Sequence, residues 1–492
     1  MAEPDEPDFD CLPDEILRSI FLCVPVKQRL RLESVCRRWR QIMPYNDLKQ
    51  LNLVNCLFAD SNANQMDTLP ITAALFSVVR RSKDRLESVS FGQRYLLITP
   101  TCINLIGENC TNLQELDLSY CKVTENILQS LIRIANRLRI LNLANTHFFI
   151  NDVEQHSYAI CQLFQSMVNL ECLNLQKTNI HNLQAVPFLP ESLKCINLNS
   201  CGPLRHEYLL ELLTKCIYLQ ELHLSTYSSL DETILDVICN LENLQILELS
   251  HLAFGDLIAR QTTAGLDFSS IKRLENLREL YVHYSNAFDD RALQKICENC
   301  KKLQVLNLSH CRNLCDYRAL TLLTDLVKLI VGATNCLSDA GLTAIAAANQ
   351  KLRIFTAASC PISSVGVRGL AENCASLQEL SILQSDPIDD NAVLQICSHC
   401  QNIAKIVVQG SDVSDGLLFG IANKRPLKLS WLDLSFCPKI TDLGIEVLAQ
   451  ALSLDKFPFA KSPTHLNIFV HQTRVTKISK LRTEGTLVHL HF

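Results

Sequence analysis

The chain has 492 residues, of which 48% are hydrophobic and 20% are charged, and its formal net charge is −5. This length and apolar content allow a large buried core, and a pI of about 6.2 excludes the global basic field that nucleic-acid-binding proteins carry. No apolar run approaches the roughly 20 residues that a membrane-spanning helix needs.

The chain begins with an acidic stretch. The sequence MAEPDEPDFD carries five acidic residues and no apolar run, so it lacks the pattern of a signal peptide. We expect residues 1–8 to form a disordered tail. We also expect a protein that is not secreted and that acts in the cytoplasm, the nucleus or both.

Residues 9–46 do not follow the pattern of the rest of the chain. The stretch FDCLPDEILRSIFLCVPVKQRLRLESVCRRWRQIM holds more apolar side chains than about 35 residues can bury alone. The segment therefore either packs as a helical cap on the residues that follow or holds an apolar face open for a partner.

This segment resembles an F-box. The match consists of Leu12-Pro13-x-Glu15-Ile16-Leu17, then Ile20-Phe21, Leu30-x-Leu32 and Val35-Cys36-Arg37-Arg38-Trp39, in the family's order and spacing. There are departures: Val24 stands where Leu is usual, and Gln28-Arg29 replace the common Asp-Leu.

The resemblance implies a small all-α module that lays an apolar face against the adaptor protein of an SCF-type ubiquitin ligase, a helix-in-groove contact. The adaptor-binding residues that it implies are Leu12, Pro13, Ile16, Leu17, Ile20, Phe21, Leu30, Val35 and Trp39.

A leucine-rich frame, Leu-x-x-Leu-x-Leu, recurs along most of the remaining chain. It opens at Leu113, Leu138, Leu170, Leu193, Leu219, Leu244, Leu277, Leu303, Leu326, Leu352, Leu377, Ile403 and Leu429. Successive openings lie 23 to 33 residues apart, close to the period of a leucine-rich repeat, in which each unit gives one short strand and one return segment. With earlier copies at Leu48 and Leu86 and a degenerate one at Leu466, we predict about sixteen repeats over residues 47–469 and a C-terminal cap over residues 470–492.

The segments between these frames are amphipathic. For example, TDLGIEVLAQAL (441–452) places Ile445, Leu448 and Leu452 on one helical face, which we expect to pack on the strands. The pattern predicts an α/β leucine-rich-repeat solenoid, a horseshoe with parallel strands inside and helices outside. The longer steps predict insertions near 57–80, 146–160, 252–270 and 453–462, as loops on one rim.

The chain has 23 cysteines, and many of them occupy one of two recurring positions. One position lies three residues before an opening, as at Cys110, and the other lies eight residues after one, as at Cys121. This placement indicates small buried side chains. Equivalent cysteines of neighbouring repeats would lie roughly 4.8 Å apart, so geometry alone permits some disulfides, but the absence of a secretion signal favours free thiols.

Two Cys-x-x-Cys pairs, Cys297/Cys300 and Cys397/Cys400, have the spacing of half a zinc site. The pairs lie four repeats apart, too far to share a metal, and each continues a helical apolar stripe. We therefore assign them to the core.

The repeats resemble the cysteine-containing class of leucine-rich repeats, and an F-box followed by such repeats resembles the F-box and leucine-rich-repeat family. That resemblance implies a substrate-recognition subunit of an SCF-type ubiquitin ligase. In it the repeats bind the protein to be ubiquitinated, and the cullin and RING subunits are reached only through the adaptor.

The sequence gives no sign of chemistry. It contains no Gly-rich phosphate loop, no H-E-x-x-H and no G-x-S-x-G. We expect a non-catalytic chain without metal or cofactor and without a nucleic-acid or membrane partner. The alternative is a repeat scaffold or inhibitor that acts outside ubiquitin ligation.

The substrate should lie on the face that the inward leucines leave exposed, because side chains alternate along a strand. Acidic, aromatic and histidine residues gather there at Glu221, His223, Glu248, Glu279, Tyr281, His283, Tyr284 and His310. A second group is Trp431 with Asp433 and Phe436. Such residues suit a peptide that carries Arg or Lys, docked between the openings at Leu219 and Leu303 or on the rim loop 252–270. The alternatives are the C-terminal group, or that these are ordinary polar strand positions.

Overall fold

The computed structural model describes residues 12–45, 47–53, 69–92, 98–149, 153–178, 180, 184–201, 204–226, 230–251, 269–286, 288–334, 336–385, 387–424, 428–452, 465–476, 483 and 486–492. The acidic stretch 1–8 and nearly all of the predicted insertions at 252–270 and 453–462 lie outside these residues. The chain divides into two compact units, Met1–Glu221 and Leu222–Phe492, which are described in turn.

The first unit begins with three short helices. They are α1 (Asp14–Leu22), α2 (Val26–Leu32) and α3 (Arg37–Ile42). Pro13 and Pro25 stand directly before α1 and α2, where the fixed backbone angle and missing N–H of proline suit a helix start. The helices share a small core in which Leu17 and Phe21 are buried.

Parallel strands follow, one for each predicted opening. They are β1 (Gln50–Asn52), β2 (Ser88–Ser90), β3 (Glu115–Asp117), β5 (Ile140–Asn142), β7 (Cys172–Asn174) and β8 (Cys195–Asn197), and β9 (Glu221–His223) runs across the unit boundary. The strands β1 to β8 pair in register, as with Leu116↔Leu141. The central residue of each, a Leu, Val or Ile, is buried and its neighbours are more exposed, which confirms the predicted alternation.

Helical segments return the chain from one strand to the next. They are α5 (Leu69–Ser82), η2 (Lys83–Arg85), α6 (Pro100–Asn109), α7 (Glu125–Ile134), η3 (Ala135–Arg137), α8 (Val153–Ser166), η4 (Val186–Phe188) and α9 (His206–Lys215). Two predicted insertions therefore need correction. The described part of 57–80 is helix α5, and 146–160 holds β6 (His147–Phe149), which pairs with β4 (Lys122–Thr124), and the start of α8.

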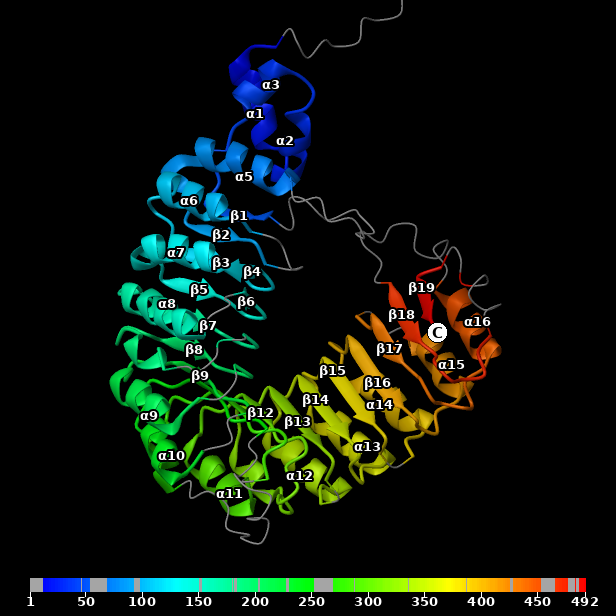
Figure 1. Cartoon of the computed structure of the whole chain (residues 1–492). Helices are drawn as coiled ribbons and strands as arrows, with labels where there is room; N and C mark the ends of the chain where they lie inside the picture. The colour runs from blue at the N-terminus through cyan, green and yellow to red at the C-terminus, as the bar shows by residue number, and fades with distance from the viewer. Residues whose placement is uncertain are drawn as a thin grey trace, which may run out of the picture. The chain divides into compact units, whose positions relative to one another are not determined.

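The second unit repeats the same two-layer arrangement (Figure 1). Its strands are β10 (Ile246–Glu248), β11 (Glu279–Tyr281), β12 (Val305–Asn307), β13 (Lys328–Gly332), β14 (Ile354–Ala358), β15 (Glu379–Leu383), β16 (Lys405–Gln409), β17 (Trp431–Asp433), β18 (Leu466–Phe469) and β19 (Val488–His491). Its helical segments are α10 (Glu232–Cys239), η5 (Ser269–Arg273), α11 (Asp290–Asn299), η6 (Arg318–Leu322), α12 (Asp339–Ala348), α13 (Ser364–Asn373), α14 (Asp390–His399), α15 (Asp415–Lys424) and α16 (Asp442–Ala451).

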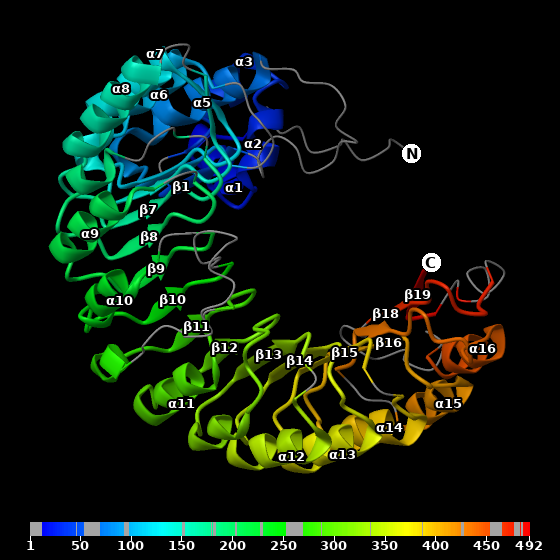
Figure 2. The same cartoon turned by 60° about the horizontal axis from the view of Figure 1, so that its bottom comes forward.

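These helices cover one face of the strand layer of the second unit, and no described helix covers the other face (Figure 2). None of the described helices has the length and apolar content to cross a membrane. The expected α/β leucine-rich-repeat architecture is thus confirmed for each unit. The C-terminal end differs from prediction, because Val488–His491 does not cap the edge but forms a further parallel strand in register with β18.

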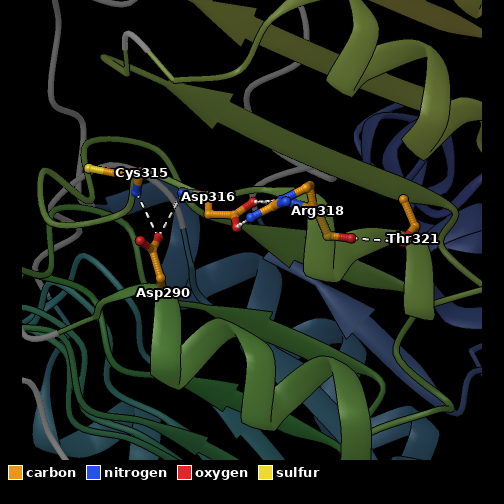
Figure 3. A network of polar contacts seen from close by, with 5 residues as sticks. All are labelled: Asp290, Cys315, Asp316, Arg318 and Thr321. Carbon is orange, nitrogen blue, oxygen red and sulfur yellow. Dashed lines mark hydrogen bonds and ion pairs between the residues drawn. The ribbon is translucent and has the colours of Figure 1, made fainter.

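In several repeats of the second unit, an aspartate at the first residue of a helix ties that repeat to the next. Asp390 accepts the backbone N–H of Ser414 at 2.7 Å and its hydroxyl at 2.5 Å, and Asp415 does the same for Thr441 at 2.8 and 2.6 Å. Figure 3 shows a variation: Asp290 accepts two backbone N–H groups, from Cys315 and Asp316, and Asp316 pairs with Arg318 at the start of η6.

The same aspartates account for the glycines near the starts of the following helices. A Cβ atom on Gly416 would lie 2.6 Å from the Asp390 carboxylate, and one on Gly444 would lie 2.4 Å from that of Asp415. The hydroxyl and the glycine of one repeat therefore both serve the aspartate of the repeat before it.

Replacing Asp390 with Ala should lower the free energy of unfolding of the second unit by about 1–3 kcal/mol, because two half-buried donors of Ser414 lose a charged acceptor. Urea denaturation followed by circular dichroism measures this loss. The control is Asp325→Ala, which removes only an exposed ion pair with Lys351 and should cost under about 1 kcal/mol. Equal losses in the two variants would contradict the structural role of the aspartate.

The position eight residues after an opening is a hydrogen-bonding position. The thiol of Cys311 lies 3.1 Å from the Val282 carbonyl oxygen and that of Cys437 lies 3.3 Å from the Val408 carbonyl oxygen, each in the preceding repeat. Thr146 occupies the same position and donates to the Leu118 carbonyl oxygen at 2.9 Å. The position thus selects a small donor, and cysteine is one of several that fit.

Burial of most of these thiols confirms the core assignment. Cys297, Cys300, Cys397 and Cys400 are all buried, and burial raises the pKa of the Cys300 thiol to about 12. Three cysteines differ from that expectation, because Cys23, Cys315 and Cys336 are exposed.

We predict that a thiol reagent at pH 8 modifies Cys23, Cys315 and Cys336 in the native protein within minutes, because only the thiolate reacts and exposure favours it. The buried thiols of Cys297, Cys300, Cys397 and Cys400 should react only after denaturation. Mass spectrometry of tryptic peptides after timed alkylation measures both rates. Early modification of Cys300 or Cys400 would contradict the burial of these thiols.

Candidate functional site

The first helix of the F-box-like segment divides its apolar side chains between two faces. Leu17 and Phe21 point into the module and are 0% and 3% exposed. Pro13, Ile16 and Ile20, at positions i, i+3 and i+7, form an exposed stripe, with Ile16 49% exposed and Ile20 38% exposed. Burial of one face fixes the helix, so that the stripe is held toward solvent.

The other predicted adaptor-binding residues differ in exposure. Val35 is 59% exposed, whereas Leu12, Leu30 and Trp39 are half-buried. The Trp39 ring meets the Phe21 ring edge to face with centroids 5.1 Å apart. Within the nine predicted residues, Leu17 and Phe21 therefore belong to the internal core of the module. Leu22, which was not among the nine, is also exposed, but it lies on a different face of α1 from Ile16 and Ile20.

Arg29, one of the departures from the F-box pattern, points away from this stripe. Its guanidinium makes a bidentate ion pair with Asp47 at 2.8 Å and donates to the backbone carbonyl oxygens of Leu22, Val24 and Pro44. The side chain of Arg29 is 4% exposed. Hydrogen bonding to this guanidinium holds the pKa of Asp47 below its usual value.

Glu33 joins the F-box-like segment to the first repeats. Its carboxylate accepts hydrogen bonds from Tyr45 at 2.8 Å and Ser77 at 2.8 Å, and pairs with Arg81 at 3.0 Å. Ser77 and Arg81 lie on α5, so the bonds cross from the module to the repeat layer of the same unit. Burial and the nearby Glu33 carboxylate raise the pKa of Tyr45.

Replacing Glu33 with Ala should loosen the F-box-like segment from the first repeats, because three donors lose their shared acceptor. Hydrogen–deuterium exchange should rise by about tenfold or more over residues 12–45, while the second unit exchanges as before. The control is Glu87→Ala, which removes an exposed pair with Lys49. Unchanged exchange over 12–45 would show that Glu33 does not hold this junction.

The residues between the two inward-facing leucines of each frame form a column across the strands, and several of them have a structural task. Asn142, Asn174 and Asn197 each accept the backbone N–H of the residue two positions later at 3.0 Å, and Asn307 and Asp433 do so at 3.1 and 3.0 Å. At these five positions the residues act as ordinary polar strand residues that bond to the backbone, which was one of the two interpretations of the exposed strand face. In β13 to β16 the column holds other residues, and there the strand itself continues for two more positions.

His223, Glu248 and Tyr281 occupy the same column on short strands but bond elsewhere. His223 Nδ1 lies 2.8 Å from Glu248 Oε2, across from β9 to β10. The Tyr281 hydroxyl donates to Glu279 at 2.7 Å, and burial together with this carboxylate raises the pKa of Tyr281. We call His223, Glu248, Glu279, Tyr281, His283, Tyr284, His310 and His251 the central cluster.

Three rings of the central cluster stack in successive repeats. His251 lies 4.6 Å from Tyr284, and Tyr284 lies 4.1 Å from His310, with interplanar angles of 10° and 7°. All three have positive φ, between 55° and 59°, and they follow neighbouring strands at the same position. The regular strand spacing of about 4.8 Å therefore brings the rings to stacking distance.

His283 lies beside this stack. Its ring meets the His251 ring at 5.2 Å, and its Nδ1 lies 2.7 Å from the Ser250 hydroxyl. Burial, then the neighbouring His251, lowers the pKa of His283, so this imidazole is neutral at pH 7. His251 was not predicted as a site residue, although its position matches those of Tyr284 and His310, which were.

The stack changes what the central cluster can offer a partner. Both faces of Tyr284 are covered by imidazoles, so the predicted cation–π contact with an Arg or Lys cannot form on this ring. The ring edges and the half-buried Glu248 and Glu279 carboxylates remain. Glu221 is also half-buried and is the last residue of the first unit.

Trp431 lies apart from the central cluster, on β17, five strands along from β12. It stacks on Phe469, and Asp433 beside it is buried. Phe436, the third member of the predicted C-terminal group, is exposed and meets His471 edge to face. Among the described residues, no group of three or more His, Cys, Asp or Glu could hold a metal ion.

Comparison with known proteins gives the following. The F-box domain family matches residues 9–51. F-box/LRR-repeat protein 17 of Arabidopsis thaliana is 28% identical over 262 residues, which is 50% of this chain and 41% of that protein. A Caenorhabditis elegans protein whose name describes it as a candidate RNA-binding protein is 24% identical over 319 residues, 64% of this chain and 41% of its own.

The chain thus spans about two fifths of the length of these two relatives. Among solved structures, a leucine-rich-repeat protein of Leptospira interrogans overlaps 93% of this chain and 92% of its own, with 15% identity and a TM-score of 0.41. The chain therefore carries a match to the F-box domain over residues 9–51, followed by the repeat units described above, and in this order it is similar to relatives named F-box/LRR-repeat proteins.

Proposed function

We propose that the chain is a substrate-recognition subunit of an SCF-type ubiquitin ligase. The observation that carries this proposal is the exposed apolar stripe Pro13, Ile16 and Ile20 on α1, within the matched F-box. Three apolar side chains on one helix face are unfavourable in water and favour a partner with an apolar groove. The adaptor of the ligase is such a partner, and the cullin and RING subunits would follow through it.

In this proposal the chain does no bond chemistry. Its contribution is proximity, because it holds a bound protein near a ubiquitin-loaded enzyme carried by another subunit. The contacts of Glu33 and Arg29 support this role, since a fixed junction between the F-box and the first repeats limits how far a bound adaptor can swing. Action in such a ligase implies a place in the cytoplasm or the nucleus.

The adaptor contact is tested with the double variant Ile16→Ala/Ile20→Ala in the full chain. We expect at least about 30-fold weaker adaptor binding, the effect of removing an interface anchor worth about 2 kcal/mol. Biolayer interferometry with purified adaptor measures it. The control is Arg18→Ala, on the same helix about 200° around its axis from Ile16.

Thermal unfolding of the double variant should match that of the wild type, because both side chains are already exposed. Adaptor binding that survives in the double variant would contradict the proposed role and favour a repeat scaffold or inhibitor outside ubiquitin ligation. Loss of binding in Arg18→Ala as well would place the contact on a different face of α1.

We further propose that the protein to be ubiquitinated docks on the central cluster. Three residues of this cluster, His223, Glu248 and Tyr281, support the proposal. They stand on three-residue strands, at the position where other three-residue strands carry the structural asparagine, and they bond to other side chains instead. The half-buried carboxylates of Glu248 and Glu279 favour a segment that carries Arg or Lys, held by charge and by ring edges.

The variant Glu279→Arg/Tyr281→Ala should abolish capture of the substrate and leave adaptor binding intact. Affinity capture from proteasome-inhibited cells, quantified by mass spectrometry, measures the proteins that are lost at least tenfold. The matched control Glu298→Arg makes the same charge change on α11, on the helical layer, and should capture the wild-type set. Substrate capture that persists in the double variant would rule out the central cluster as the docking site.

A further inference from the structure

The last three strands of the second unit carry a row of rings on the face without helices, and the strand before them places a lysine beside it. Trp431 of β17 stacks on Phe469 of β18 with centroids 4.2 Å apart, and Phe469 stacks on His491 of β19 at 4.4 Å and 11°. The Lys405 ammonium, on β16, lies 5.3 Å from the centre of the Trp431 ring. We call Lys405, Trp431, Phe469 and His491 the terminal row.

Two members of the terminal row stand where other repeats place small polar residues. Phe469 pairs in register with Asp433, and His491 pairs with Phe469, in the column that holds the structural Asn or Asp of other repeats. Trp431 is nevertheless 37% exposed. A smaller side chain would serve the fold equally well at these positions on the sheet face. Partly exposed aromatic side chains are the usual anchors of protein interfaces.

The charges around the terminal row favour an acidic partner. Asp433 is buried and accepts hydrogen bonds from Gln409 at 2.7 Å and from the Ser435 N–H, so its carboxylate is already engaged. Lys405 makes no ion pair among the residues that the structure describes. Glu379 lies opposite Lys405 in the strand register of β15 and β16, on the side away from Trp431, but the two side chains form no ion pair.

Imidazole groups add donors along the same edge. His489 Nε2 lies 3.0 Å from His465 Nδ1, and His491 Nε2 lies 3.1 Å from the Asn467 side-chain oxygen. The sequence from residue 424 to 492 also holds ten Lys and Arg against five Asp and Glu, although the whole chain is acidic. The C-terminal part of the protein therefore attracts negative charge.

We propose that the terminal row is a second protein-binding surface, which takes an acidic peptide segment with an apolar side chain. The apolar side chain packs against the ring edges of Trp431 and Phe469, and a carboxylate meets Lys405. A single-stranded nucleic acid fits less well, because bases need open ring faces to stack on and the faces between these rings are filled. This surface does not depend on the proposed ligase role and lies apart from the central cluster.

A phage-displayed library of random dodecapeptides, selected on the immobilised full chain, identifies the preferred peptide. We expect enriched peptides with net negative charge and at least one large apolar residue. The strongest of them is then synthesised with a fluorescent label, and its affinity for the full chain is measured by fluorescence anisotropy.

Trp431→Ala and Lys405→Glu should each weaken binding of this peptide at least tenfold, while the control Lys302→Glu, an exposed lysine elsewhere on the second unit, should bind as the wild type does. Lys405→Glu removes no ring, so it tests the surface even where Trp431→Ala lowers stability. Raising the salt concentration from 0.05 to about 0.5 M should also weaken binding, because exposed charges are screened.

Selection of neutral or basic peptides would overturn the proposal, as would equal affinity in Trp431→Ala and Lys405→Glu. Tighter binding of a twelve-nucleotide oligouridine, lost in Trp431→Ala, would overturn it in favour of nucleic acid. No adaptor is present in these measurements, so their outcome is separate from that of Ile16→Ala/Ile20→Ala.

Discussion

One backbone turn, made once in each repeat, determines how the exposed face of the sheet is built. From β3 to β18, each strand of the large sheet is followed by a residue with positive φ, between 48° and 68° for the non-glycine residues. It comes directly after β13 to β16 and three residues after the others. Such a conformation costs roughly 1–2 kcal/mol for a residue with a Cβ atom. Hydrogen bonds offset this cost, because the turn residue donates its N–H to the turn of the next repeat, as Tyr284 does to the Ser309 carbonyl oxygen at 2.8 Å. The residue after it anchors the turn to the previous repeat, as Cys311 does to the Val282 carbonyl oxygen.

Because the turns of successive repeats are bonded to one another, their side chains form a column with the spacing of the strands. Small or polar residues fill most of this column, as at Ser200 and Ala333. Three consecutive turns carry rings, at His251, Tyr284 and His310, and the spacing of the turns brings these rings into stacking contact. The same regularity at the C-terminal end aligns Phe469 with His491. A repeat scaffold thus converts a run of similar residues, one per repeat, into a surface with a fixed geometry.

The sequence predicts the strands well and the turns poorly, for a physical reason. Alternation along a strand follows from the backbone alone, so burial of Leu116 or Leu280 between exposed neighbours could be predicted from the frame. The turn breaks that alternation, and the stacking of His251 on Tyr284 depends on a backbone angle that no residue type there dictates. The strand β19 was missed because Val488-x-Leu490 carries only part of the frame. The helix α5 was taken for a loop because the step from Leu48 to Leu86 is long.

In the F-box the same distinction separates what could be predicted from what could not. The motif places Leu17 and Ile16 side by side in sequence, and both were assigned to the adaptor contact. Only the packing of three helices shows that Leu17 faces inward and Ile16 faces solvent. Adjacent residues of a helix point about 100° apart, so a module with one small core must bury one of them and expose the other.

Arg29 shows how a departure from a family pattern can be compatible with the family's function. The position is usually apolar in the F-box pattern, and a charged residue there would be expected to weaken the adaptor contact. Here the guanidinium is buried and satisfied by three backbone carbonyl oxygens and by Asp47. The substitution therefore leaves the Pro13–Ile20 stripe untouched. With Glu33 and its three partners, it adds polar bonds to a junction that a module this small could not hold by apolar burial alone.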